Sequence, residues 1–89
     1  MALKIFTQVT CPRCPAAKAL GEKLASSGIE VQSFDINEED GLAEANMYMV
    51  KATPSLVLVN EVEDEVYSWR GVVPTMEEIL AAIKNASRN

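Results

Sequence analysis

The sequence predicts a mixed α/β domain whose strands and helices follow the order βαβαββα. Three observations support this fold class. Short β-prone segments alternate with helix-like ones, two strand-like segments follow each other near the C-terminus, and 89 residues suit one domain, residues 1–89. Right-handed crossovers between the parallel strands would place helices on both faces of a central four-stranded mixed sheet.

The N-terminal part contains the first three predicted elements. Residues 2–8 (ALKIFTQ) are apolar and β-prone, which predicts a strand that ends just before the two cysteines. Residues 12–28 predict a helix of about four turns, because apolar residues recur four apart on one face and Gly28 can end it. Residues 29–36 (IEVQSFDI) predict a second strand.

The remaining elements form a short helix, a strand pair and a last helix. The acidic residues 37–41 suit a loop and a helix N-terminus, and the helix itself is predicted over 42–49. Residues 55–59 (SLVLV) indicate a strand buried on both faces, and we expect residues 66–70 to pair with it in antiparallel fashion. Residues 75–78 (TMEE) form a capping-box pattern that opens the final helix.

Composition excludes several classes of function. A net charge of −5 disfavours binding to nucleic acid or to an anionic membrane surface, and the absence of histidine excludes His-based triads and His-rich metal sites. No apolar run approaches the roughly 20 residues of a membrane span. The N-terminal stretch lacks the basic and long apolar regions of a secretory signal, so we expect a cytoplasmic protein.

The two cysteines, Cys11 and Cys14, have C-x-x-C spacing at the junction of the first strand and helix. With Cys11 as the N-cap, free amides and the helix dipole would stabilise its thiolate, which is the reactive form. Arg13 adds a positive charge near both sulfurs, and Cys14 is close enough to close a small disulfide ring. Pro15 would then occupy N4 and remove a helical hydrogen bond, which this placement leaves unexplained.

A C-x-x-C pair has other interpretations as well. The two cysteines could be small buried hydrophobic residues. Alternatively, the chain could be a noncatalytic module whose thiols bind a metal or an iron–sulfur cluster across a dimer, because two chains would supply four thiolates. One chain alone supplies too few ligands for a structural zinc site, so we expect no metal and no cofactor in a monomer.

The motif Cys11-Pro12-Arg13-Cys14, together with Thr53-Pro54 directly before residues 55–59, resembles the thioredoxin superfamily over nearly the whole chain. The chain is most similar to the short glutaredoxin-like thioredoxins of prokaryotes. This resemblance implies a thioredoxin-like fold and a protein thiol–disulfide oxidoreductase in which Cys11 attacks and Cys14 resolves. It also implies that Pro54 is a cis-proline and that Thr53 faces the substrate. The residues alone would equally allow a trans Thr53–Pro54 turn.

Departures from the family pattern bear on the reductant and on proton transfer at Cys14. Residues 70–74 lack the Gly-Gly and acidic pair with which glutaredoxins hold glutathione, which argues against glutathione as the reductant. The first strand offers no carboxylate where thioredoxins bury an aspartate, so water or another group would have to assist proton transfer at Cys14. The expected partners are protein disulfide substrates and an upstream reductase.

Overall fold

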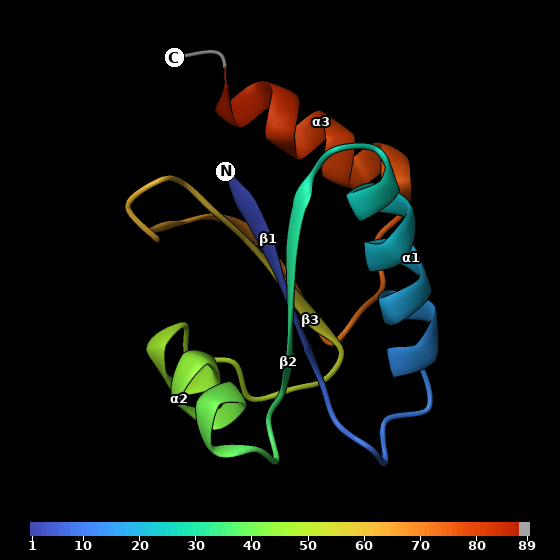
Figure 1. The fold of residues 1–89 in the computed structure, drawn as a ribbon, viewed down its shortest axis with the longest axis vertical. Coiled ribbons are helices and arrows are strands. Elements are labelled where there is room, and N and C mark those ends of the chain that lie inside the picture. Colours follow the sequence, from blue (N-terminus) through green and yellow to red (C-terminus); the bar gives the residue numbers. More distant parts are fainter. Residues whose placement is uncertain (88–89) are drawn as a thin grey trace.

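The computed structural model describes residues 1–87, and residues 88–89, the end of the predicted domain, lie outside the described part. The predicted order βαβαββα is confirmed. Figure 1 shows the sheet in the centre, with α1 and α3 on one side and α2 on the other. The elements are β1 (Ala2–Thr7), α1 (Cys14–Ser26), β2 (Glu30–Asp35), α2 (Glu39–Met47), β3 (Ser55–Val59), β4 (Glu65–Arg70) and α3 (Met76–Ala86).

The sheet is mixed, as predicted, with the strand order β2-β1-β3-β4. β1 pairs with β2 in parallel and with β3 in antiparallel fashion, and β3 and β4 form the expected antiparallel pair. The two central strands, β1 and β3, are buried along their whole length because helices cover both of their faces.

Two hydrophobic cores lie on opposite faces of this sheet. Alternate residues of each central strand point to opposite faces, so β1 contributes Leu3 and Ile5 to one core and Phe6 to the other. The first core is closed by α1 and α3, and the second by α2. The first contains Leu3, Ile5, Ala17, Leu24, Leu56, Leu58, Trp69 and Ile79, and the second contains Ala2, Phe6, Ala45, Tyr48, Val50, Val57 and Val59.

The helices differ from their predicted bounds mainly at α2, which spans Glu39–Met47 rather than 42–49. Its first turn carries Glu39 and Asp40, whose negative charges favour the N-terminal end of a helix. It ends early because Met49 adopts a left-handed conformation with φ 55°. The predicted capping box of α3 is present. Within residues 1–87, none of the helices has the length and apolar character that a membrane crossing requires.

Gly41 is required where the first turn of α2 passes over the end of β2. A Cβ atom at Gly41 would overlap the backbone carbonyl of Asp35. We therefore expect Gly41→Ala to lower the free energy of unfolding by about 2–3 kcal/mol, because backbone atoms cannot move aside as a side chain can. Denaturant unfolding measures this. Gly21→Ala in α1 is the matched control, since its Cβ would meet only side-chain atoms, those of Ile5 and Val31; an equal loss in both variants would contradict the explanation.

An unexpected buried charge lies on the α2 face of the sheet. The Lys4 side chain of β1 is 2% exposed, and its Nζ donates to Glu44 Oε1 at 2.6 Å and to Glu63 Oε1 at 2.7 Å. Burial by itself would lower the pKa of Lys4, but the hydrogen bonds to Glu44 and Glu63 and the charge of Glu44 raise it above its ordinary value. Tyr48 adds an aromatic face to Nζ and donates its hydroxyl to the Glu63 carbonyl at 2.7 Å.

Candidate active site

Strand register brings three loops together at one end of the sheet. Phe6 of β1 pairs with Ser55 of β3, and Ser55 pairs with Arg70 of β4. The end of β1, the start of β3 and the end of β4 are therefore neighbours. As a result, the loop that carries the cysteines, the Thr53–Pro54 segment and Gly71 all lie at this end.

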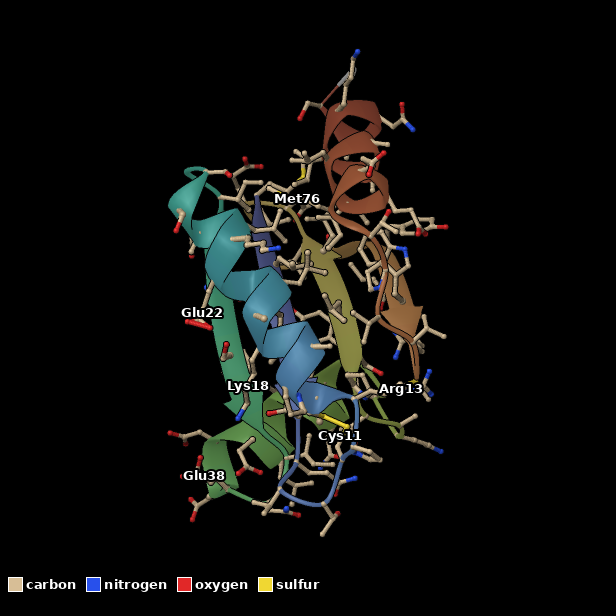
Figure 2. The ribbon with its side chains drawn as sticks, turned by 90° about the vertical axis from the view of Figure 1, so that its right-hand side faces the viewer. Cys11, Arg13, Lys18, Glu22, Glu38 and Met76 are labelled. Atoms are coloured by element: carbon tan, nitrogen blue, oxygen red, sulfur yellow. A yellow bond between two sulfur atoms is a disulfide. The ribbon has the colours of Figure 1, made fainter. Side chains whose placement is uncertain are left out.

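Cys11 and Cys14 form a disulfide, and their Cα atoms lie 5.3 Å apart, within the usual range. Figure 2 shows this bond at the end of α1, beside the end of the sheet. Cys11 lies in the loop and is 7% exposed, whereas Cys14 is the first residue of α1 and is 2% exposed. Cys11 is thus the more accessible of the two sulfur-bearing residues.

The predicted N-cap of the first helix was wrong, because Arg13 rather than Cys11 occupies that position. Cys11 belongs to a turn instead, in which its N–H donates to the Gln8 carbonyl at 3.2 Å and its carbonyl accepts from Cys14 at 3.4 Å. The first helical bond runs from the Ala17 N–H to the Arg13 carbonyl at 3.3 Å. Cys11 therefore lies two residues before the N-cap, so the expected stabilisation of its thiolate by an N-cap position does not apply.

The same shift explains Pro15. It stands at the second helical position rather than the fourth. The N–H groups of the first turn have no partner within a helix, so a proline there removes no hydrogen bond. The fixed φ of proline also suits the start of a helix. Pro15 is therefore compatible with the helix start.

The Thr53–Pro54 peptide bond is cis, as the family resemblance implied. Pro54 is fully buried, and its carbonyl accepts from the Gly71 N–H at 2.9 Å. Ser55 Oγ donates to the Ala52 carbonyl at 2.7 Å. These bonds hold the segment against the end of β4.

Arg13 lies on the exposed side of the cysteine loop. Its Nη2 donates to the Gly71 carbonyl at 3.3 Å, and Figure 2 shows the residue beside the end of β4. The guanidinium thus connects the N-terminus of α1 to the turn after β4. Its positive charge is close to the site but remains in contact with solvent, which weakens its effect on neighbouring groups.

Gln8 belongs to this site although no motif in the sequence selects it. Its Nε2 donates to Thr53 Oγ1 at 2.8 Å. A single glutamine at the end of a strand is usually a surface residue, and the bond joins positions 45 residues apart. Only the pairing of β1 with β3 brings the two side chains together.

The buried polar residues of the described part, residues 1–87, include no acid. Within the described residues they are Lys4, Thr7 and Ser55, and the charge of Lys4 is held by carboxylates on the opposite, α2 face. Within the described residues, the fold therefore supplies no buried carboxylate in place of the one that the first strand lacks. Water remains the simplest carrier for a proton at Cys14.

Comparison with known proteins identifies the family. The family model described as "Thioredoxin domain" matches residues 1–84. The chain belongs to this thioredoxin domain family. It is 33% identical over 85 residues to a thioredoxin of Methanocaldococcus jannaschii, covering 92% of this chain and 91% of that protein. It is also 35% identical over 57 residues to a probable thioredoxin of Archaeoglobus fulgidus, a match that covers 63% of each chain.

A solved thioredoxin structure supports the fold. Thioredoxin 1 of Thermosipho africanus superposes with a TM-score of 0.79, covering 97% of this chain and 93% of that one at 17% sequence identity. The predicted thioredoxin-like fold is therefore confirmed. Family membership and the Cys11–Cys14 disulfide together support thiol–disulfide oxidoreductase function and do not favour the alternative of a dimeric metal or cluster module.

Proposed function

We propose that this thioredoxin-family protein reduces disulfides in other proteins and is itself reduced by an upstream reductase. The observation that carries the proposal is the Cys11–Cys14 disulfide, whose more exposed cysteine lies in the loop that Gln8 hydrogen-bonds to Thr53. The cytoplasm is the proposed site of action, because a reducing compartment can return the disulfide to the dithiol form.

The proposed reaction proceeds in two exchanges. The Cys11 thiolate attacks one sulfur of the substrate disulfide; that bond breaks, its other sulfur leaves as a thiolate and a mixed disulfide forms. Cys14 then loses its proton to water and attacks Cys11 Sγ, which releases the second substrate sulfur and forms the Cys11–Cys14 bond. Two electrons pass to the substrate, and the reductase supplies two electrons and two protons to restore the dithiol.

Substrate selection is proposed to use the loops around the cysteines. Thr53 is the residue assigned to meet an extended substrate segment. Val9, which is 84% exposed, and Val72, which is 46% exposed, follow β1 and β4 at the same end of the fold and offer apolar contacts. We assign recognition of an apolar segment of an unfolded or flexible protein to this surface. A glutathione-dependent route is not proposed, because residues 70–74 lack the glutaredoxin motif.

Reduction of insulin disulfides tests this function. Purified protein with dithiothreitol as electron source should accelerate insulin reduction over dithiothreitol alone, without stoichiometric metal in the sample. An inactive protein that contains metal or a coloured cluster, lost together with dimer formation in Cys14→Ser, would support the other class of function instead.

Arg13 is proposed to tune the reactivity of Cys11 through its charge. Arg13→Glu should slow alkylation of the Cys11 thiol at neutral pH by about two- to fivefold, because a negative neighbour disfavours the thiolate and the site is exposed to solvent. The difference should shrink at high salt. Arg13→Lys, which keeps the charge, is the control. Equal slowing by both variants would assign the effect to the lost bond with Gly71 rather than to charge.

A further inference from the structure

The side chain of Gln8 makes the hydrogen bond between the cysteine loop and the segment before β3. The Gln8 carbonyl accepts from the Cys11 N–H at 3.2 Å, while its Nε2 donates to Thr53 Oγ1 at 2.8 Å. Gln8 is partly buried, so its amide is shielded from competing water. Among the hydrogen bonds found in residues 1–87, the bond from Gln8 to Thr53 is the one that joins the cysteine loop, residues 8–14, to the segment of residues 51–54.

The other contacts of this segment leave Thr53 dependent on Gln8. Ala52 is held by Ser55 Oγ, and Pro54 is held by the N–H of Gly71. Both anchors face β3 and β4 rather than the cysteines. Without the amide of Gln8, the Thr53 side chain would lose its hydrogen-bonded connection to the loop that carries Cys11.

We propose that Gln8 is a positioning residue that fixes Thr53 relative to Cys11 for substrates with an extended backbone. This inference rests on the proposed function and adds a determinant of substrate class to it. A protein substrate must place its backbone against Thr53 and its sulfur at Cys11 at the same time, so it is sensitive to the spacing between them. A small disulfide needs access to Cys11 alone.

Gln8 is also neutral, which separates positioning from electrostatic effects. Replacing it with methionine keeps the side-chain length and leaves the charge around Cys11 unchanged. Gln8→Met should therefore lower kcat/KM for insulin by roughly three- to tenfold, the range expected for loss of one hydrogen bond. The rates with a small aromatic disulfide and with iodoacetamide should stay within about twofold of wild type.

Gln32→Met is the matched control. It removes the only other glutamine of the chain, whose amide donates to Glu30 at 2.8 Å on an exposed part of β2. This variant should reduce insulin like the wild type. Thr53→Val removes the acceptor of the Gln8 bond, and the double variant Gln8→Met/Thr53→Val should be no worse than Thr53→Val alone, because both changes remove one interaction. If Gln8→Met fails to fold, unchanged insulin reduction by Thr53→Val would overturn the inference, because this variant removes the same bond.

Each alternative result has a defined meaning. Equal losses with insulin and with the small disulfide would show that Gln8 acts on the cysteines, which overturns the inference. Unchanged insulin reduction in Gln8→Met, or losses that multiply in the double variant, would overturn it as well. A wild-type protein that fails to reduce insulin overturns the proposed function and this inference with it, whereas an active wild type separates the two.

Discussion

A Cys11→Ser variant is expected to lose protein-disulfide reduction down to the uncatalysed background, while Cys14→Ser should accumulate a stable mixed disulfide with its substrate. The roles differ because Cys11 is the more exposed cysteine in the loop, and Cys14 is buried at the start of α1. Without Cys11 no sulfur can attack the substrate, and without Cys14 no neighbouring sulfur can release it. Insulin reduction measures the first effect, and intact-mass analysis of the protein mixed with insulin measures the second.

The reduced wild-type protein is the appropriate stability control, because both variants lack the Cys11–Cys14 bond. Similar unfolding midpoints would assign the lost activity to chemistry rather than to folding. Alkylation of the reduced protein at mildly acid pH gives an independent check, and Cys11 should be labelled first. Faster labelling of Cys14, located by peptide mapping, would contradict the assignment of roles.

The largest expected effect on stability comes from leaving Lys4 buried without its carboxylates. The double variant Glu44→Gln/Glu63→Gln keeps the shape of both side chains but removes their charges. Its free energy of unfolding should fall by about 3 kcal/mol, at the lower end of the roughly 3–5 kcal/mol for a broken buried pair. The lower end applies because the Glu63 side chain is 54% exposed and water can replace part of its contact. Chemical denaturation at neutral pH measures the loss.

Lys4→Met distinguishes an uncompensated charge from lost packing. Methionine fills a similar volume and carries no charge that needs a partner, so Lys4→Met should lie within about 1.5 kcal/mol of wild type. Placed in the double variant, Lys4→Met should restore much of the lost stability. Failure of that rescue would show that the carboxylates stabilise the fold through other contacts. All these variants should still reduce insulin, since the network lies on the α2 face.

Alkaline pH should weaken the wild type relative to Lys4→Met. Burial lowers the pKa of Lys4, but the hydrogen bonds to Glu44 and Glu63 and the charge of Glu44 outweigh it, so the folded-state pKa lies above the ordinary value of 10.5. A raised pKa adds stability that is fully present below the unfolded-state pKa and is lost as pH rises through the folded-state pKa. The stability difference between the two proteins should therefore be constant near neutrality and shift against the wild type in strongly alkaline buffer.

Local features of the sequence were sufficient for the order of elements and for the redox pair. Residue period, turn residues and a capping box depend on neighbours along the chain, so βαβαββα and the Thr75 cap were predicted correctly. The position of Cys11 and Cys14 between a strand and a helix is equally local. The cis bond before β3 was correct only through the resemblance to a family, because the residues themselves allowed either isomer.

Tertiary contacts decided the rest. The turn from Gln8 to Cys14 moved the N-cap of α1 to Arg13, and packing of Gly41 on Asp35 let α2 begin inside the expected loop. Local sequence patterns did not predict the contacts between residues far apart in the chain. Lys4 meets its partners across 40 and 59 residues, and the bond between Gln8 and Thr53 spans 45. The sequence determined which two residues form the disulfide, whereas strand pairing decided which side chains surround them, because only the folded sheet brings distant residues into contact.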